Sequence, residues 1–221
     1  MANTKKSDSA VIAGQAVYTR RTLDLYDVVV LGLSNALIWK CPTRRLLDHY
    51  NENVAAKHLD VGVGTGWFLD HCRFPSGGPE ITLLDLNTAC LERASARIRR
   101  YAPKTVHANI LEPVEVEAGP FNSIGLNYVL HCLPGNLSQK AIVFDHLKPL
   151  LTQGGVVFGS TLLAEGVDRS RAAQALMRFY NKKGIFSNRQ DSVEDLRREL
   201  ETRFEDVRIE TVGCAALFVA R

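Results

Sequence analysis

Three glycines at alternate positions, Gly62, Gly64 and Gly66, form the part of this sequence best suited to hold a ligand. A short apolar run over residues 59–63 leads into them, and a helical pattern follows. This order predicts a strand, a tight loop and the first turn of a helix. Glycine suits such a loop because it accepts left-handed backbone conformations and lets bare backbone approach a ligand. A tight turn without a ligand is the alternative interpretation.

A carboxylate, Asp85, follows the loop by about twenty residues, at the end of a second strand-like run. A carboxylate at this place can accept hydrogen bonds from both hydroxyls of a ribose. The alternative is that Asp85 caps the helix expected to start near Thr88. Together with the glycine loop, Asp85 predicts a cofactor that contains a nucleoside.

The spacing of the glycines narrows the choice of cofactor. The dinucleotide fingerprint G-x-G-x-x-G would require its third glycine at Trp67 or at Leu69, depending on the first glycine counted. A Walker A loop is excluded because no G-K-[ST] follows. The observed order is D-x-G-x-G-x-G and begins at Asp60. It resembles motif I of the class I S-adenosylmethionine-dependent methyltransferases.

This resemblance implies S-adenosyl-L-methionine as the cofactor and assigns roles to particular positions. Asn109 matches a position that often carries aspartate and contacts the adenine amino group, and the amide of Ile110 would face adenine N1. Leu86 would pack on the adenine or ribose, and Asn127 would lie beside the methionine part. The implied cofactor-binding residues are Asp60, Gly62, Gly64, Thr65, Gly66, Asp85, Leu86, Asn109, Ile110 and Asn127.

A histidine, His131, follows the fourth expected strand at a place where small-molecule members of the resembled family commonly carry one. It is our candidate catalytic residue, because imidazole can act as a general base near neutral pH. Lining the pocket, or bonding a neighbouring backbone group, is the alternative role. The string from Asn127 is not N-P-P-Y, which argues against methylation of nucleic acid bases.

Aromatic side chains before and after the core are candidates to contact the methyl acceptor, since aromatic rings stack on planar molecules. Ordinary helix packing is the alternative for each of them. The candidate substrate-binding residues are Tyr18, Tyr26, Trp39, His131 and Tyr180.

The elements that must position these residues alternate between strands and helices. Strand-like runs cover residues 57–61, 81–85, 105–108, 121–126 and 156–160, and helical patterns between them cover 88–101 and 138–151. This alternation predicts β-α-β units and a parallel sheet. Helical patterns over 168–183 and 192–203 precede runs over 206–211 and 215–221, whose short connection at Gly213 requires antiparallel pairing.

We therefore expect an α/β fold with a Rossmann-like, doubly wound sheet, mostly parallel, whose last strand is antiparallel. The resemblance implies seven strands. Before the sheet, apolar residues that include Tyr26, Leu33 and Leu37 recur at helical spacing, and another helix starts at Pro42. The expected organisation is a single domain with a flexible tail over residues 1–15, a helical cap over 16–54 and a catalytic core over 55–221.

The overall composition is that of an ordinary globular protein. The chain has 221 residues, and 27 basic against 24 acidic residues give a formal charge of +3, which is too balanced to indicate a nucleic acid partner. The five cysteines form no C-x-x-C pair, so neither a metal site nor a disulfide framework is expected. No apolar run approaches the ~20 residues of a membrane span. We expect a cytoplasmic monomer or homodimer.

The resemblance implies transfer of a methyl group to a small molecule, in particular a planar or aromatic metabolite, by in-line displacement. The acceptor atom stays open among O, N, C and S. Two alternatives remain: a protein of this fold that binds the cofactor without transferring its methyl group, and a nicotinamide-dependent oxidoreductase.

Overall fold

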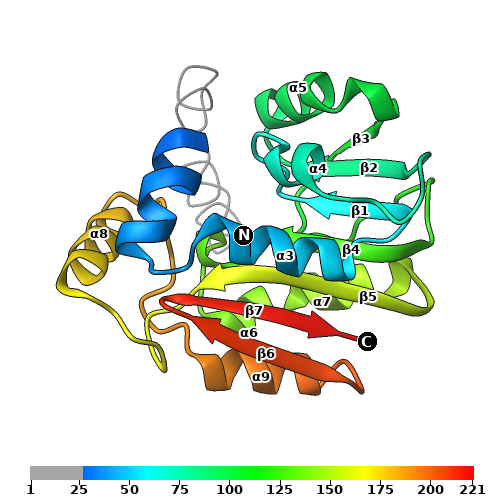
Figure 1. Cartoon of the computed structure of the whole chain (residues 1–221). Helices are drawn as coiled ribbons and strands as arrows, with labels where there is room; N and C mark the ends of the chain where they lie inside the picture. Colours follow the sequence, from blue (N-terminus) through cyan, green and yellow to red (C-terminus); the bar gives the residue numbers. More distant parts are fainter. Residues whose placement is uncertain (1–26) are drawn as a thin grey trace, which may run out of the picture.

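The computed structural model describes residues 27–221 (Figure 1). The expected tail and two candidate acceptor contacts, Tyr18 and Tyr26, lie outside the described residues. Within the described part, seven strands form one sheet in the order β3-β2-β1-β4-β5-β7-β6. The strands are β1 (Lys57–Val61), β2 (Glu80–Asp85), β3 (Lys104–His107), β4 (Phe121–Asn127), β5 (Leu151–Leu162), β6 (Val207–Val212) and β7 (Ala215–Ala220).

The sheet has the mixed topology that the sequence predicts. Strands β1 to β5 pair in parallel, whereas β7 runs antiparallel to both β5 and β6. The strand order reverses at β1, which pairs with β2 on one side and β4 on the other. Ligands bind beyond the carboxyl ends of strands at such a switch point. The ends of β1, β2 and β4 therefore mark the place to examine.

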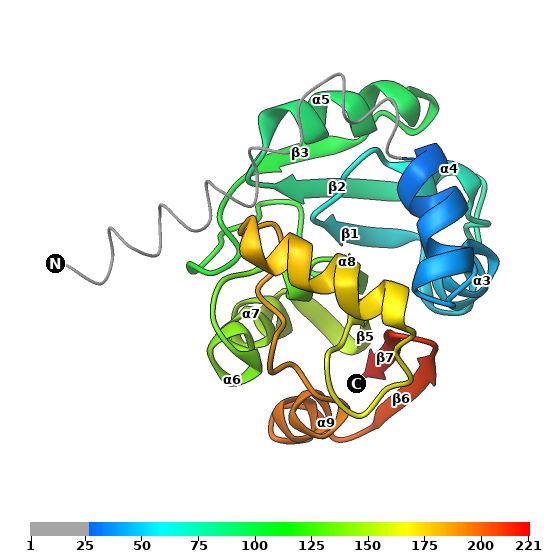
Figure 2. The ribbon, with the colours of Figure 1, turned by 90° about the vertical axis from the view of Figure 1, so that its left-hand side faces the viewer.

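Helices cover both faces of the sheet. In Figure 2, α3 and α4 lie on one side, and α6 and α7 lie on the other. Beyond the carboxyl ends of the parallel strands lie a π-helix, η1, and the helix α8 (Figure 1). The helices are η1 (Asp27–Ile38), α3 (Thr43–Asn53), α4 (Trp67–His71), α5 (Thr88–Arg97), η2 (Arg99–Tyr101), η3 (Leu130–Cys132), α6 (Leu137–Lys140), α7 (Ile142–Leu147), η4 (Lys148–Leu150), α8 (Arg171–Lys182) and α9 (Val193–Glu201).

One predicted helix is divided in the structure. The pattern over 138–151 forms α6, α7 and the 3-10 turn η4, and β5 already begins at Leu151. Two features coincide with these breaks. Lys140 is fully buried and bonds to residues far along the chain, and Pro149 lies at the start of η4, where it cannot donate the backbone hydrogen bond of an α-helix.

The helix before the core does not bury the face that its spacing suggests. Leu33 and Leu37, which recur at helical spacing, are 56% and 68% exposed, while Leu31 and Asn35 are buried. The cause is that η1 is a π-helix, so each turn takes more residues and the inward face rotates away from 3.6-residue spacing. The described part of the cap is helical as predicted.

The turn between the last two strands holds the end of this cap. The N–H of Cys214 donates to the carbonyl oxygen of Trp39 at 2.8 Å. Gly213 has a φ of +56°, and a Cβ added there would lie 2.2 Å from the same oxygen. Only glycine therefore lets the β6–β7 turn lie against the cap.

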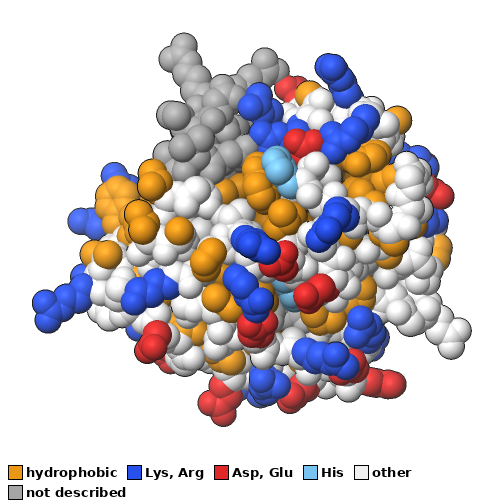
Figure 3. Space-filling view, viewed as in Figure 1, with side chains coloured by type: hydrophobic (Ala, Val, Ile, Leu, Met, Phe, Trp, Pro, Cys, Tyr) orange, Lys and Arg blue, Asp and Glu red, His pale blue; other side chains and the backbone are white. Residues whose placement is uncertain are grey.

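Surface charges are mixed, as the balanced composition predicts. On the face in Figure 3, Lys and Arg side chains lie close to Asp and Glu side chains. Ion pairs such as Arg203 with Asp145 and with Glu199 are examples of this mixing. Within the described residues, no helix is both long enough and apolar enough to cross a membrane.

Candidate cofactor site

The backbone of the loop after β1 favours glycine at all three positions. All three have positive φ values: +68° for Gly62, +52° for Gly64 and +72° for Gly66. A Cβ at Gly62 would lie 2.5 Å from Val129 Cγ2, and one at Gly66 would lie 2.9 Å from the Cα of Ala94. A Cβ at Gly64 would meet nothing within 4 Å, because this residue lines open cavities.

The loop is anchored on both sides by hydrogen bonds. The N–H of Gly62 donates to Leu84 O at 2.8 Å, and Arg97 Nη1 on α5 donates to Thr65 Oγ1 at 3.1 Å. Thr65 is itself buried. The loop is thus held by β2 and α5 before any ligand binds.

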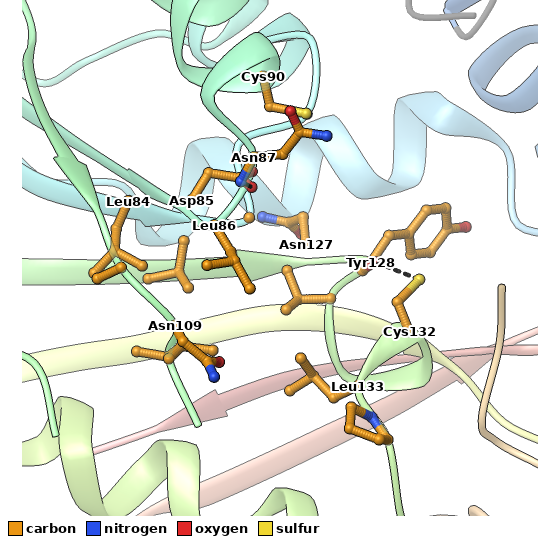
Figure 4. A pocket seen from close by; sticks show the side chains of 17 residues that line it. Leu84, Asp85, Leu86, Asn87, Cys90, Asn109, Asn127, Tyr128, Cys132 and Leu133 are labelled. Carbon is orange, nitrogen blue, oxygen red and sulfur yellow. Dashed lines mark hydrogen bonds between the residues drawn. The ribbon is translucent and has the colours of Figure 1, made fainter. Parts of the chain in front are cut away.

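A first cavity lies beyond the ends of β2, β3 and β4 (Figure 4). Asp85 and Leu86 reach it from the end of β2, and Asn127 from the end of β4. The sequence-predicted residues that line it are Gly62, Gly64, Asp85, Leu86, Asn109, Ile110 and Asn127. The cavity therefore brings together side chains from four loops that are far apart in the sequence.

The alternative role of Asp85 as a helix cap is not what the structure shows. Asn87 caps α5, since its side chain accepts from the N–H of Ala89 at 2.9 Å. Asp85 Oδ1 instead accepts from the N–H of Asn87 at 2.8 Å. Burial raises the pKa of Asp85 to about 6, against the opposing effect of backbone N–H donors from Asn87, Gly64 and Val63.

Hydrogen bonds from nearby backbone and histidine groups hold the residues expected around an adenine. Asn109 Oδ1 accepts from the N–H of Leu111 at 3.1 Å, which leaves one lone pair of this oxygen for a further donor. The carbonyl of Ile110 accepts from His146 Nδ1 at 2.9 Å, so its peptide group is fixed in direction. The carbonyl of Leu86 bonds to the ring of His107 at 2.8 Å.

A second cavity adjoins the first on the side of the glycine loop. The sequence-predicted residues that line it are Asp60, Gly62, Gly64, Thr65, Gly66 and Asn127. Gly62, Gly64, Asn127 and Tyr128 line both cavities. The structure therefore places all ten residues that the resemblance assigned to the cofactor around two adjoining spaces.

The amide of Asn127 is an unpaired donor at the junction of these spaces. Its Oδ1 accepts from Ser160 Oγ at 3.1 Å, but its buried Nδ2 has no hydrogen-bond partner. A buried donor without a partner costs about 1–3 kcal/mol. The orphaned amide, the glycine cradle and the Asp85 carboxylate all fit a polar ligand that carries a ribose, and so they fit S-adenosylmethionine.

Two candidate acceptor contacts do not reach these cavities. Trp39 is 2% exposed and packs in the core, with its ring 6.2 Å from that of Phe186. Tyr180 is half-buried on α8, with its ring 4.9 Å from Phe186. The described cavities therefore receive neither aromatic ring.

His131 is buried on η3 and is held by the backbone of β5. Its Nδ1 accepts from the N–H of Leu162 at 3.2 Å, and Phe186 meets its ring edge-on at 4.5 Å. Burial lowers the pKa of His131 to about 3, and the charge of Lys140 acts in the same direction. The side chain lines neither cavity, so His131 is a neutral, structurally engaged imidazole.

Sequence reasoning missed the lining residue Tyr128. Its φ is +59°, an unusual value for a residue with a bulky side chain, and its hydroxyl donates to Asn35 Oδ1 of η1 at 3.0 Å. It thus connects the cap to the site. Cys132, Leu133 and Pro134 also line the first cavity. No local pattern marks them, except that they follow the strand end at Asn127.

No group of three or more potential metal-binding side chains occurs among the residues described.

Comparison with known proteins identifies the family of this chain. A family model described as a methyltransferase domain matches residues 39–203. Demethylluteothin O-methyltransferase of Streptomyces thioluteus is 39% identical over 213 residues, 96% of this chain and 93% of the relative. The physcion biosynthesis cluster O-methyltransferase of Aspergillus chevalieri is 37% identical over 209 residues, 94% of each protein.

Solved structures share the fold at low sequence identity. The complex of DhpI with SAH superimposes with a TM-score of 0.71 at 13% identity, over 97% of this chain and 98% of that one. Human N-acetylserotonin methyltransferase gives a TM-score of 0.63 at 15% identity, over 94% of this chain and 58% of that one. With the family match, these findings set aside the nicotinamide-dependent alternative. The chain belongs to the methyltransferase-domain family and is a class I S-adenosylmethionine-dependent methyltransferase.

Proposed function

We propose that this enzyme methylates a hydroxyl oxygen of a small, planar acceptor. The observation that carries the proposal is the pair of adjoining cavities joined at Gly64, Asn127 and Tyr128. Oxygen as the acceptor atom is supported by the two relatives named O-methyltransferases at 39% and 37% identity. S-adenosylmethionine supplies a methyl group that its sulfonium already activates.

The first cavity is assigned to the adenosine part of the cofactor. Asp85 accepts from the ribose hydroxyls, Leu86 packs beside them, and Asn109 and Ile110 contact the adenine. Their places around one cavity support these roles. Since the fixed loops hold these groups before binding, little conformational entropy is lost when the nucleoside enters.

The second cavity is assigned to the methionine part. Asp60, Thr65 and Gly66 line it, and Asn127 offers its unpaired Nδ2 where the two cavities meet. Asn127 therefore orients either the methionine end or the acceptor oxygen near the methyl group. Holding donor and acceptor in line is the main catalytic contribution that such a site can make.

The acceptor is assigned to the apolar end of the first cavity, beside Cys132, Leu133 and Pro134. These side chains suit a ring system better than a charged metabolite. The assignment predicts an acceptor with one polar group near Asn127 and an apolar body.

A hydroxyl acceptor has to lose its proton, and this limits the class of hydroxyl. The described residues that line the two cavities include no histidine, and their only carboxylates are Asp60 and Asp85, both assigned to the cofactor. We therefore infer that the acceptor hydroxyl is itself acidic, as in phenols and enols, and that it releases its proton to water. On this view His131 is a positioning residue, because its Nδ1 is already occupied by Leu162 N–H.

The proposal is tested by incubating the protein with S-adenosylmethionine and matched phenols, cyclic enols, aliphatic alcohols and amines. Mass spectrometry and NMR of the products identify the methylated atom. Methyl ethers from the phenols or enols are expected, with little product from the alcohols. Methylation of amines or carbon atoms alone would overturn the assignment to oxygen.

A further inference from the structure

Four buried polar side chains form a continuous chain of hydrogen bonds from the middle of the sheet to the second cavity. Ser123 Oγ lies 2.8 Å from His58 Nδ1, and His58 Nε2 lies 2.8 Å from Tyr50 Oη. Tyr50 Oη donates to Asp60 Oδ2 at 2.6 Å. Ser123, His58 and Tyr50 have no exposed surface, and only Asp60 lines the cavity.

The hydrogen bonds of this chain have one consistent direction. The N–H of Ala55 donates to Ser123 Oγ at 2.8 Å, and with an imidazole that carries one ring proton the serine hydroxyl then donates to His58 Nδ1. At the other end the Asp60 carboxylate only accepts, so Tyr50 donates to it and accepts from His58 Nε2–H. Every bond therefore points toward Asp60.

The surroundings leave this chain little freedom. The Tyr50 ring stacks on Phe68 at 5.7 Å with an interplanar angle of 7°, and it meets Phe158 edge-on at 5.2 Å. A Cβ at Gly125 would lie 3.2 Å from His58 Cε1, so glycine makes room for the imidazole. Hydrogen bonds in such an apolar surrounding reinforce one another and keep a fixed geometry.

We propose that this chain positions Asp60 to bind the ammonium group of the cofactor's methionine part. Tyr50 holds Oδ2, whereas Oδ1 has no hydrogen-bond partner among the described residues, on a side chain that lines the second cavity. Short bonds between an ammonium and a carboxylate are among the strongest in proteins. Tyr50, His58 and Ser123 are positioning residues, because they act through Asp60 without lining the cavity.

This inference rests on the proposed assignment of the second cavity to the methionine part, so its test separates the two. Two ligands are compared by calorimetry: S-adenosylhomocysteine, which carries the ammonium group, and 5′-methylthioadenosine, which has the same nucleoside and a thioether but no amino acid part. Tyr50→Phe removes the donor to Asp60 and keeps the ring. We expect it to weaken binding of S-adenosylhomocysteine by about 10- to 100-fold, as for a hydrogen bond to a charged group, and binding of 5′-methylthioadenosine by less than about twofold.

A second variant keeps the test decisive if Tyr50→Phe fails to fold. Ser123→Ala removes the hydroxyl of the chain that lies farthest from Asp60. We expect it to weaken binding of S-adenosylhomocysteine more than binding of 5′-methylthioadenosine, but by less than Tyr50→Phe does. Tyr101→Phe, outside both cavities, is the matched control, and thermal unfolding checks that each variant is folded. Equal decreases in affinity for both ligands, or an unchanged affinity in a folded Tyr50→Phe variant, would overturn the positioning role. A wild-type protein that binds neither ligand would instead overturn the assignment of the cavities.

Discussion

The Lys140 ammonium group donates to Asp191 Oδ2 at 2.6 Å, although neither side chain has appreciable exposed surface. Lys140 also donates to the carbonyl of Ser187 at 2.5 Å, and the N–H of Ser187 donates to the carbonyl of His131 at 2.8 Å. The pair therefore fastens the segment between α8 and α9 to η3, directly behind the site. It supports the position of His131 without contacting a cavity-lining group of the cofactor site.

Lys140→Met should lower the free energy of unfolding by about 3–5 kcal/mol, because it leaves the buried Asp191 carboxylate without its counter-charge. Chemical denaturation at neutral pH measures the loss. The control is Lys182→Met, since Lys182 is exposed on the last turn of α8. Similar stabilities for the two variants would contradict a structural role for the pair.

Two glycine variants should separate ligand binding from folding. Gly64→Ala points a methyl group into open cavity space and costs about 1–2 kcal/mol for its left-handed backbone, so the protein stays folded but loses affinity for S-adenosylhomocysteine. Gly66→Ala brings the methyl group against the backbone of Ala94 on α5 and should destabilise the fold much more. Calorimetry and thermal unfolding of both variants check this contrast. Full affinity in Gly64→Ala would contradict our placement of the cofactor.

Cofactor affinity should depend on pH through Asp85, whose pKa burial raises to about 6. If Asp85 accepts from the ribose hydroxyls as we propose, they bind its ionised form, so affinity is highest above pH 7 and falls as the pH decreases through 6. At pH 5 about one carboxyl group in ten is ionised, so affinity for S-adenosylhomocysteine should be about tenfold lower than at pH 8. Calorimetry at several pH values measures this, and Asp85→Asn should bind weakly without that dependence.

Stability of the unliganded protein should respond to Asp85 in the opposite sense. The folded-state pKa lies above the unfolded one, so protonation favours the folded state. The contribution of Asp85 is therefore present at low pH and is lost as the pH rises through 6. Comparing the pH dependence of unfolding between the wild type and Asp85→Asn isolates this contribution.

His131→Asn should retain most of the methyltransferase activity. Its side-chain oxygen can accept from Leu162 N–H in place of Nδ1, and the pH dependence of kcat/KM should still follow the hydroxyl of the acceptor. If His131 were a general base, its removal would instead lower the rate of methyl transfer by about 10²–10⁴-fold. A decrease in rate of that size, with unchanged cofactor affinity, would show that His131 is a catalytic residue.

The sequence predicted the sheet well because its signals are local. The alternation of strand and helix patterns predicted the parallel strands. The short turn at Gly213 predicted the antiparallel pairing of the last two strands. The glycine loop and Asp85 predicted one side of the site for the same reason. The break after Lys140 was not predictable, since it depends on a partner, Asp191, about fifty residues away.

Other features depend on contacts that no spacing records. The π-helical winding of η1 turns Leu33 and Leu37 outward, although their 3.6-residue periodicity indicates the reverse. The hydrogen-bond chain to Asp60 joins α3, β1 and β4, so Tyr50 and Ser123 carry no recognisable motif. Sequence reasoning therefore found residues that line the two cavities and missed those that hold them in place.

The turn at Gly213 has a consequence for engineering this enzyme. Hairpin turns are usual places to insert a peptide tag or a reporter domain. This turn, however, contacts the helical cap, because the N–H of Cys214 donates to the carbonyl of Trp39. An insertion here would loosen the cap even though the turn is remote from the glycine loop. The loop at Gly77 and Gly78, which has open space around it, is the better site for a fusion.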